Sequence, residues 1–520
     1  LIAAKAVKLM HQAGIPANAI QLLPGSGATI GAQLTSDPRI AGVCFTGSTP
    51  TAQRINKNMA LHLEPSAPLI AETGGLNAMI VDSTALPEQV VRDVLASAFQ
   101  SAGQRCSALR VLYLQEDIAD NLLEMLYGAM DQLQLGNPWQ LSTDVGPVID
   151  QTAMQKIERH CKNYEAQGKL LKTMAVPEKG TFIAPTVLKV SGIEELSEEI
   201  FGPVLHVATF KGKDIDLVIE TINAQNYGLT FGLHSRVDSR VQHLISKIKA
   251  GNAYVNRNQI GAIVGSQPFG GEGLSGTGPK AGGPHYVKRF LKAEQLPSQS
   301  AAQAKAQTLP LIELQQQINT LANCPRNSAW LNYQSNRQTL LRRWIDETSD
   351  TSLVTRELLA QIFSPTQPLH MPGPTGELNV LSESARGLVL CLADSLKRAL
   401  VLTLTALSQG NCVLMLVSDQ DAGDLQEFND VAEQLAIPVT FIAAKISPKD
   451  LTSVQNFSAI ATDTDTQTMR EIRIALAERD GTLIPLINEK SAERYILERH
   501  LCVDTTAAGG NASLIATVED

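Results

Sequence analysis

The sequence predicts an α/β protein with parallel sheets. Helical and strand patterns alternate along residues 1–297, and a second alternating block covers residues 373–490. Alternation of this kind implies parallel strands whose carboxyl ends hold ligands. The 520 residues are 44% hydrophobic and 18% charged, with 37 Gly and 25 Pro, which is ordinary for a globular protein. This composition excludes disordered, collagenous and disulfide-scaffold proteins, and the length suits about three or four domains.

The first 81 residues are predicted to alternate short helices with strands. We predict helices over residues 1–13, 28–35 and 50–63, and strands over residues 19–23, 40–46, 69–72 and 78–81. The chain starts with Leu1 inside the first helical pattern, without an N-cap or a preceding strand. Because such a helix needs a surface to pack on, we expect the chain to begin inside a domain. We also expect these 520 residues, made alone, to be inactive and poorly folded.

Charge, cysteine content and hydropathy limit the classes of function. The net charge is −9 and no basic block occurs, so a nucleic-acid surface is not expected. Seven Cys form no CxxC motif, which indicates reduced thiols in a cytoplasmic protein. The most apolar stretch, residues 387–417, is interrupted by charged residues and falls short of the ~20 apolar residues of a membrane span. We predict no metal site and no membrane contact from this chain.

Two segments of the chain repeat one another at an offset of 417 residues. Residues 34–72 and 451–489 share 11 identities in 39 ungapped positions, against about two or three expected from composition. The second copy has Thr464 and Asp465 where the first has Gly47 and Ser48 at a strand end. A glycine lets the backbone approach a phosphate, whereas an aspartate repels one. The pattern predicts a duplicated nucleotide-domain segment with a structural second copy; a likeness shared by any two βαβ units is the alternative.

Cys106 is the candidate nucleophile. It lies in a turn, Gly103-Gln104-Arg105-Cys106-Ser107, that follows the helical pattern of residues 90–101. The thiolate is the reactive form of cysteine, and the neighbouring Arg105 predicts a lowered pKa for this thiol. The alternative is a buried core cysteine, which is the interpretation we give to the other six.

Two glutamates are further candidates. Glu72 follows an apolar strand and precedes Thr73-Gly74-Gly75, a setting suited to a general base with a raised pKa. A solvated glutamate at a strand end is the alternative. Glu199 lies in a run of acidic residues, and such runs usually lie on the solvent-exposed surface of a protein. The turn Phe201-Gly202-Pro203 that follows Glu199 favours a more fixed position.

Taken together, these segments resemble the aldehyde dehydrogenase superfamily. Five motifs occur in its order and spacing: Phe45-Thr46-Gly47-Ser48-Thr49, Glu72-Thr73-Gly74-Gly75, Gly103-Gln104-Arg105-Cys106, Glu199-Ile200-Phe201-Gly202-Pro203 and Pro268-Phe269-Gly270-Gly271. Cys106-Ser107, the stretch 261–265 and Gln267 to Gly271 resemble the glutamate-semialdehyde (pyrroline-5-carboxylate) dehydrogenases. The sequence past residue 300, which ends in the motif of residues 505–514, resembles the C-terminal part of long bacterial proline utilization A proteins. The resemblance therefore covers nearly the whole chain.

The resemblance implies an aldehyde dehydrogenase fold: part of a Rossmann-like NAD domain and an α/β catalytic domain, followed by a degenerate second Rossmann-like domain. The expected divisions are residues 1–72 for the C-terminal part of the NAD-binding domain, 73–265 for the catalytic domain, 266–297 for the substrate loop and the end of the dehydrogenase, 298–330 for a linker and helix, 331–500 for the non-catalytic repeat and 501–520 for the tail.

The resemblance also implies the chemistry. Cys106 would attack the aldehyde, hydride would pass to NAD+, and Glu72 would activate the water that hydrolyses the thioacyl enzyme to glutamate. This scheme divides one difficult oxidation into two easier steps. The other implied contacts are Thr46, Gly47, Ser48 and Thr49 with the pyrophosphate; Glu199 and Phe201 with the nicotinamide ribose; Ser107 and the N–H groups of Gly261 and Ala262 with the substrate carboxylate; and Phe269 with its aliphatic chain.

Several parts of such enzymes are expected upstream of Leu1. They include the oxyanion-hole asparagine, a ribose-binding lysine and an FAD-dependent proline dehydrogenase domain, and in some members a DNA-binding domain. Those upstream domains would account for any binding of FAD, DNA or membrane. The resemblance further implies a homo-oligomer located in the bacterial cytoplasm or peripheral to the inner membrane. The preference for NAD over NADP is inferred from the resemblance alone.

Two other functions stay open. The first is a dehydrogenase for another short acidic aldehyde, such as succinate semialdehyde. Those enzymes usually hold the carboxylate with arginine, and Arg105 and Arg257 are near the implied site in sequence. The second is a non-catalytic scaffold. The presence of Cys106, Glu72 and Glu199 together argues against a scaffold. A segment that has lost its function is expected to lose such residues, as the second copy of the repeat has lost the Gly-Ser turn.

Overall fold

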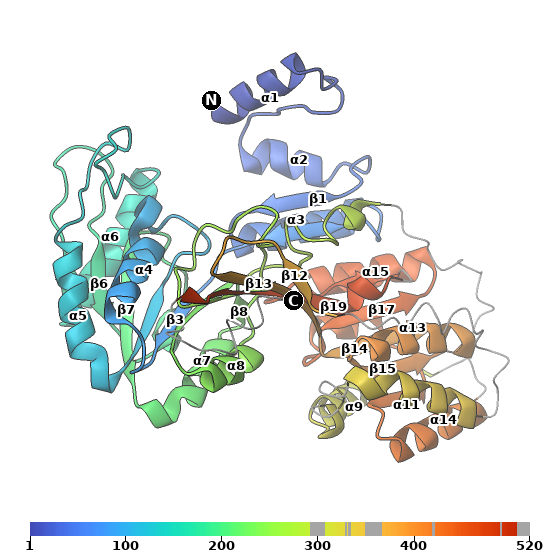
Figure 1. Cartoon of the computed structure of the whole chain (residues 1–520). Coiled ribbons are helices and arrows are strands. Elements are labelled where there is room, and N and C mark those ends of the chain that lie inside the picture. Colours follow the sequence, from blue (N-terminus) through green and yellow to red (C-terminus); the bar gives the residue numbers. More distant parts are fainter. Residues whose placement is uncertain are drawn as a thin grey trace.

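A computed structural model describes residues 1–291, 307–327, 330, 334–348, 367–418, 422–488 and 491–506. Figure 1 shows a larger α/β domain in cyan and green, a smaller α/β domain in orange and red, and an N-terminal segment in blue. Parallel pairing dominates both domains, so the predicted α/β class is confirmed. Among the described residues, no helix combines the length and the apolar character that crossing a membrane requires.

The larger domain is built on a ten-stranded sheet with the order β12-β13-β19-β10-β9-β3-β4-β7-β6-β5. From β19 to β6 the strands are parallel, and antiparallel strands extend both edges. Its strands are β3 (Ala78–Val81), β4 (Val111–Gln115), β5 (Leu170–Thr173), β6 (Thr186–Lys189), β7 (Val204–Phe210), β9 (Thr230–His234), β10 (Asn252–Val255), β12 (Leu369–Met371), β13 (Glu377–Ala385) and β19 (Ile496–Asp504).

Helices flank this sheet, and central strands such as β4 are buried along their whole length. Continuous burial is typical of parallel strands that are covered on both faces. The helices are α4 (Pro87–Phe99), α5 (Glu116–Met130), α6 (Gln151–Ala166), α7 (Ile215–Ala224) and α8 (Asp238–Lys247). A small antiparallel pair, β8 (Tyr227–Gly228) and β11 (Glu272–Gly273), lies outside the main sheet.

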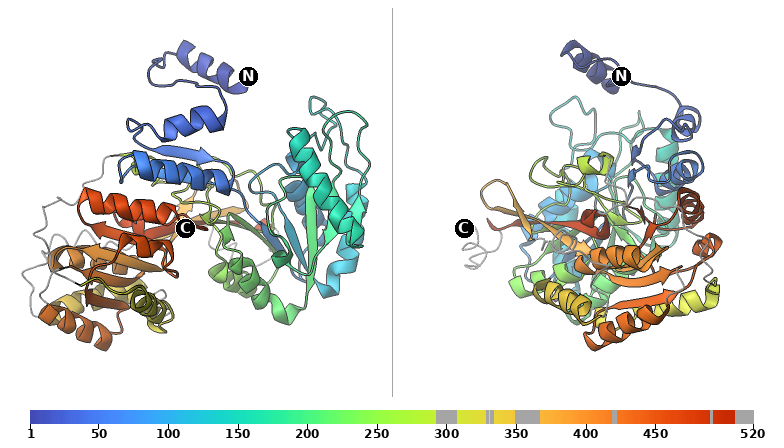
Figure 2. Two further views of the ribbon diagram at one scale, coloured as in Figure 1. Left: turned by 180° about the vertical axis from the view of Figure 1, so that it is seen from behind. Right: turned by 90° about the vertical axis from the view of Figure 1, so that its right-hand side faces the viewer.

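The N-terminal segment contains a separate two-stranded parallel sheet. Its elements are α1 (Ile2–Gln12), a π-helical turn (Gly27–Gly31), α2 (Ala32–Thr35), β1 (Val43–Thr46), α3 (Thr49–His62) and β2 (Leu69–Glu72). The strand predicted over residues 19–23 is wrong, because that stretch has no neighbouring strand to pair with among the described residues. Helix α1 buries none of its residues and protrudes from the rest of the chain in every view (Figure 2).

The smaller domain has a five-stranded parallel sheet with the order β16-β15-β14-β17-β18. Apolar clusters cover both of its faces. The elements are β14 (Leu388–Ala393), α13 (Leu396–Ser408), β15 (Cys412–Val417), α14 (Ala422–Gln434), β16 (Val439–Ala443), β17 (Ala459–Asp463), α15 (Thr466–Ala477) and β18 (Leu486–Ile487). Helices α9 (Leu311–Ala322) and α11 (Gln334–Glu347) precede them, and Trp344 of α11 is buried in one of the two clusters.

The register of the strands confirms the repeat. In the first copy Val43 pairs with Leu69, and in the second Ile460 pairs with Leu486, which is the same pairing shifted by 417 residues. Helices α3 and α15 are the corresponding helices, and they pack against each other. Arg470 of α15 donates to the Leu63 carbonyl at 3.0 Å. The position Glu489, which corresponds to Glu72, lies outside the described residues.

Strands from the C-terminal part of the sequence belong to the larger domain, which differs from the boundaries expected from the sequence. Strand β13 lies inside residues 331–500 and β19 begins inside them, yet the two strands pair with each other and β19 pairs with β10 of the larger sheet. The five-stranded sheet occupies only residues 388–487. The sequence does not predict this pairing, because backbone hydrogen bonds at a sheet edge place few requirements on the type of side chain. Most of the expected linker over 298–309 and of the tail over 501–520 lies outside the described residues.

Candidate active site

Cys106 lies in a tight turn between α4 and β4. Ser101, Ala102 and Gly103 have φ of 56°, 53° and 64°, so the chain reverses sharply before the cysteine. Glycine is required at position 103, because a Cβ there would lie 2.1 Å from the Gly202 carbonyl oxygen. The turn that holds Cys106 therefore packs directly against the loop that follows Glu199.

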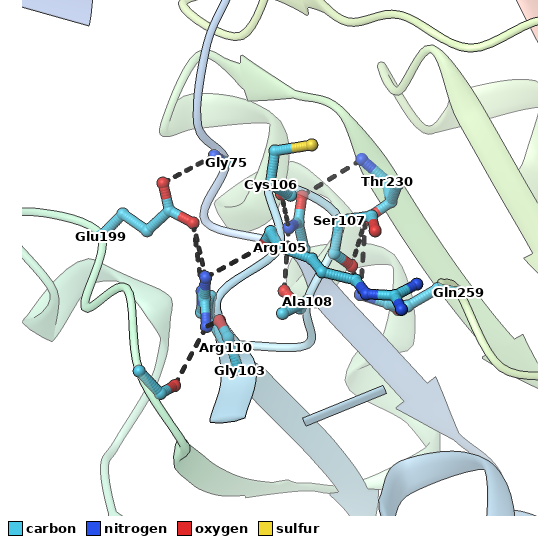
Figure 3. A network of polar contacts seen from close by, with 12 residues as sticks. Gly75, Gly103, Arg105, Cys106, Ser107, Ala108, Arg110, Glu199, Thr230 and Gln259 are labelled. Atoms are coloured by element: carbon cyan, nitrogen blue, oxygen red, sulfur yellow. Dashed lines mark hydrogen bonds and ion pairs between the residues drawn. The ribbon is translucent and has the colours of Figure 1, made fainter. Parts of the chain in front are cut away.

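Buried polar groups fix the backbone around the cysteine. Asn77 Nδ2 donates to the carbonyls of Cys106 at 2.7 Å and of Ala108 at 2.9 Å. The Ser107 carbonyl accepts from Thr230 Oγ1 at 3.2 Å and from Gln259 Nε2 at 3.3 Å. Figure 3 shows Glu199 and Arg110 on one side of this loop and Thr230 and Gln259 on the other. The thiol of Cys106 is partly exposed, so the loop presents it while its backbone is held.

The expected lowering of the Cys106 pKa is wrong. Burial raises the pKa of this thiol, and the charges of Glu199 and Glu72 raise it further. Arg105 does not compensate, because its Nε donates to Ser101 Oγ at 3.1 Å and its Nη1 lies near Gly261. The segment after β2 connects the surroundings of these groups, because the Gly75 N–H donates to Glu199 and Asn77 donates to the Cys106 carbonyl.

Glu72 ends strand β2 and faces the glycine-rich stretch that follows β10. Its Oε2 accepts from the Gly271 N–H at 2.9 Å, while its buried Oε1 has no hydrogen-bond partner. A Cβ on Gly276 would lie 2.8 Å from Oε2, so that position needs glycine. Burial raises the pKa of Glu72 to about 8, in the direction that the sequence predicted. A carboxyl group with such a pKa is suited to general-base catalysis near neutral pH.

Two charged residues near Glu72 were not identified from the sequence. Lys280 is buried, and its Nζ donates to Asn252 Oδ1 at 2.8 Å and to the Gly270 carbonyl. Burial lowers the pKa of Lys280 to about 8, and the lysine charge lowers that of Glu72. Glu498 of β19 accepts from the Lys280 backbone N–H at 2.7 Å. A strand contributed by the C-terminal part of the chain therefore borders the candidate base.

Glu199 lies beside the cysteine loop, with its carboxylate against Gly74 and Gly75. Its Oε2 accepts from the Gly75 N–H at 3.3 Å, and a Cβ on Gly74 would lie 1.8 Å from the same oxygen. Its Oε1 accepts from Arg110 Nη2 at 2.8 Å. The ring of Phe201 is 45% exposed and is available to a ligand. Arg110, which joins these groups, was not identified from the sequence.

The four residues predicted to meet a pyrophosphate lie where β1 leads into α3. Thr46 pairs with Glu72 across the two strands, and the Gly47 N–H donates to the Glu72 carbonyl at 3.1 Å. Ser48 makes no side-chain cap to α3, whereas Thr49 begins the helix. The first N–H groups of α3 therefore lack a side-chain acceptor, which is the arrangement that binds phosphate at a helix N-terminus.

The second copy of the repeat differs at this position in the way the sequence predicted. Asp465 Oδ1 accepts from the N–H groups of Gln467 at 2.9 Å and Thr468 at 3.0 Å, so the aspartate itself occupies the N-terminus of α15. Asp463 ends the preceding strand and pairs with Arg398. Neither the free N–H groups nor the charge needed for a phosphate remains at this turn.

Of the predicted substrate residues, Ser107 directly follows Cys106, and its carbonyl accepts from Gln259, two residues before Gly261, at 3.3 Å. Gly261 has φ +74°, and a Cβ there would lie 3.9 Å from Arg105 Nη1. Within the part of the chain that the structure describes, the N–H groups of Gly261 and Ala262 have no protein acceptor. Phe269 pairs with Ala281 through two backbone hydrogen bonds and precedes the Gly270-Gly271 turn against Glu72. Arg257 instead pairs with Glu377 of β13.

The candidate groups lie at the ends of strands from two different sheets. Two of them precede strands of the ten-stranded sheet, and the others follow strands of the two-stranded sheet. Cys106 precedes β4 and Glu199 precedes β7, so the expected position at carboxyl ends holds only for Glu72 and the turn after β1. Residues 1–296 match the model of the aldehyde dehydrogenase family. The chain belongs to this family. Its candidate base Glu72 ends a strand of the two-stranded sheet, and its candidate nucleophile Cys106 precedes a strand of the ten-stranded sheet.

Similar proteins extend beyond the part that the family model covers. The chain is 43% identical over 527 residues to the bifunctional protein PutA of Klebsiella aerogenes, across 98% of this chain and 38% of that protein. It is 38% identical over 301 residues to the 1-pyrroline-5-carboxylate dehydrogenase of Geobacillus kaustophilus, across 56% of this chain and 58% of that enzyme. The chain thus spans about two fifths of the length of the PutA relatives it matches.

Solved structures agree with this assignment. A variant of Bradyrhizobium japonicum proline utilization A superposes with a TM-score of 0.54 at 52% identity, over 56% of this chain and 30% of that one. A 1-pyrroline-5-carboxylate dehydrogenase from Thermus with bound NAD superposes with a TM-score of 0.52 at 36% identity, over 56% of this chain and 57% of that one. The aldehyde dehydrogenase fold is confirmed.

Proposed function

We propose that this chain carries an NAD-dependent dehydrogenase that oxidises L-glutamate γ-semialdehyde, the open form of 1-pyrroline-5-carboxylate, to L-glutamate. The observation that carries the proposal is that the segment beginning at the end of β2 brings three groups together. Glu72 ends this strand, the Gly75 N–H donates to Glu199, and Asn77 donates to the Cys106 carbonyl. The names of the PutA and 1-pyrroline-5-carboxylate dehydrogenase relatives support the choice of substrate. In this assignment the reaction is the second step of proline breakdown.

In the proposed reaction the Cys106 thiolate attacks the aldehyde carbon and forms a hemithioacetal. NAD, when bound, accepts the hydride that this carbon loses. The resulting thioacyl group is hydrolysed by water that Glu72 deprotonates, and the thiol is released with the carboxylic acid. Covalent capture keeps the carbon in place between the two steps. Both Cys106 and Glu72 act in their deprotonated forms, and both have raised pKa values, so the rate is expected to fall as the pH drops below about 8.

The residues present fit the dinucleotide. The uncapped N-terminus of α3, with Thr46, Gly47, Ser48 and Thr49, offers N–H donors to a pyrophosphate. Glu199 and the exposed ring of Phe201 would meet the nicotinamide ribose. The choice of NAD over NADP is part of the proposal and is supported by the NAD-bound Thermus relative.

The substrate carboxylate would be held by N–H groups and a cation. Gly261 and Ala262 present N–H groups without protein acceptors, Ser107 lies beside them, and Arg105 Nη1 lies near Gly261. Arg257 is engaged by Glu377 and is not directed to this anchor. Because Arg105 would suit any short acidic semialdehyde, succinate semialdehyde stays as the second candidate substrate. Phe269 would contact the chain between the two functional groups.

We further infer that the full-length protein is bifunctional, with an upstream FAD-dependent proline dehydrogenase. The name of the PutA relatives and the two-fifths share of their length support this inference. A homo-oligomer in the bacterial cytoplasm, or one peripheral to its membrane, belongs to the same proposal. No nucleic-acid contact is proposed for these residues, which carry a net charge of −9.

The test uses the full-length protein with NAD+. We expect NADH from 1-pyrroline-5-carboxylate and, when an electron acceptor is added, from proline. NADH from pyrroline-5-carboxylate alone would contradict the bifunctional part of the proposal. A higher kcat/KM for succinate semialdehyde would move the assignment to the second substrate. No NADH from any of the three would favour a non-catalytic scaffold.

Replacing Lys280 is expected to shift the pH dependence of this activity. The lysine charge lowers the pKa of Glu72, so Lys280→Met should raise that pKa above about 8. The base then loses its proton only at higher pH, and the acidic limb of the pH–rate profile moves upward. Exposed Lys288 provides the matched control, Lys288→Met, with an unchanged profile. An unshifted acidic limb in Lys280→Met would show that Lys280 does not act on the base.

A further inference from the structure

Arg110 is a buried arginine that connects the two loops of the site. It stands directly before β4, and its side chain is 1% exposed. Its Nε and Nη2 donate to Glu199 Oε1 at 3.2 and 2.8 Å. Its Nη1 donates to the carbonyls of Gly103 at 2.8 Å and Gly202 at 3.2 Å, and its Nη2 also reaches the Arg105 carbonyl at 3.1 Å. All three nitrogens are therefore used (Figure 3).

These acceptors come from two segments that are far apart in the sequence. Gly103 and Arg105 belong to the turn that presents Cys106, whereas Glu199 and Gly202 belong to the loop before β7. The two segments are in direct contact, since a Cβ on Gly103 would lie 2.1 Å from the Gly202 carbonyl oxygen. Arg110 therefore closes a bridge between the nucleophile loop and the loop that carries Glu199.

The chemistry of the bridge requires arginine. A guanidinium has five N–H donors in a fixed plane, while a lysine ammonium is a single point charge on a flexible stem. One carboxylate and three carbonyls in different directions match the first group and not the second. Glu199 also supplies the charge partner without which a buried cation is strongly destabilising. The ring of Phe201 stacks at 5.4 Å from the Arg110 guanidinium carbon and covers it.

We propose that Arg110 is a positioning residue that holds the Cys106 loop in register with Glu199, and so sets the nucleophile against the carboxylate that receives the cofactor. The roles of Cys106 and Glu199 rest on the proposed function, but the bridge itself does not. Burial raises the pKa of Glu199, and the Arg110 charge and hydrogen bonds act against that rise.

The first test is a double-mutant cycle in the full-length protein. Arg110→Met and Arg110→Lys are each expected to lower kcat/KM for NAD by about 100-fold, the scale of two lost charge-assisted hydrogen bonds. If Arg110 acts through Glu199, the double variant Arg110→Met with Glu199→Gln should be no worse than the poorer single variant. Wild-type behaviour of Arg110→Lys, or single effects that multiply in the double variant, would overturn the proposal.

The second test needs neither NAD nor an aldehyde. Iodoacetamide alkylation of Cys106, followed by peptide mass spectrometry, should be several-fold faster in both Arg110 variants, because the turn loses the anchors at its Gly103 and Arg105 carbonyls. The exposed thiol of Cys44 in the same sample should keep its rate. Arg240→Met, which removes an arginine bound to buried Asp82 at 2.7 Å, is the matched control. An unchanged Cys106 rate in both variants would contradict the bridge. If the wild-type protein forms no NADH, the proposed function fails while this measurement still decides the role of Arg110.

Discussion

Cys106→Ala is expected to abolish aldehyde oxidation in the full-length protein, with kcat falling by at least ~10⁴-fold. The reason is that hydride leaves a carbon that must first be bonded to sulfur, and no other thiol lies in the described site. The fall should appear at saturating aldehyde and NAD+, since the variant keeps the uncapped N-terminus of α3 and the Gly261 anchor. Stopped-flow measurement of NADH absorbance should show no burst in the variant.

The matched control is Cys324→Ala, which removes a partly exposed thiol that follows α9. Its rate should equal that of the wild type, because Cys324 lies in the C-terminal half and makes no contact with the Cys106 loop. A proline-dependent activity in the upstream part of the protein should survive in both variants. Steady NADH formation by Cys106→Ala would contradict the covalent mechanism.

The helices and strands with strong local patterns could be predicted from the sequence. Helix α3, strands β2 and β3, and the register of the repeat follow from periodicity and from the 417-residue offset. The strand predicted over residues 19–23 was wrong because strand propensity has no effect without a partner strand, and none lies beside it among the described residues. The association of β13 and β19 with the larger sheet was missed for the opposite reason. Backbone hydrogen bonds hold it, and they have no sequence signature.

The site shows a similar division. Cys106, Glu72 and Glu199 could be proposed from the sequence because each lies in a recognisable local motif. Arg110 was missed although it is only four residues after Cys106, because its decisive partner, Glu199, is 89 residues away. The sign of the Cys106 pKa shift was wrong for the same reason. Sequence adjacency suggested Arg105 as the dominant influence, whereas folding buries the thiol and adds the charges of Glu199 and Glu72, all of which raise its pKa. Lys280 and Glu498 likewise become neighbours only through the pairing of β19.

Ser48→Asp is expected to weaken NAD binding by about 100-fold, which corresponds to about 2.7 kcal/mol. The second copy of the repeat supplies the reason, because it carries Asp465 at the equivalent position. There the carboxylate accepts from two N–H groups of α15 and occupies the place of a phosphate. An aspartate at position 48 would do the same at α3 and would add a negative charge beside the pyrophosphate. Equilibrium titration of NAD by fluorescence would measure the effect.

Loss of fold would not explain such a result. Aspartate is a better N-cap than a serine that makes no cap, so Ser48→Asp should leave the melting temperature unchanged or slightly higher. A variant that removes the cap of the second copy, Asp465→Ala, should cost about 1 kcal/mol of stability in the smaller domain and leave NAD affinity unchanged. Unaltered NAD affinity in Ser48→Asp would place the pyrophosphate away from α3. It would also remove the physical basis for calling the second copy decayed, because the two turns would then differ without consequence.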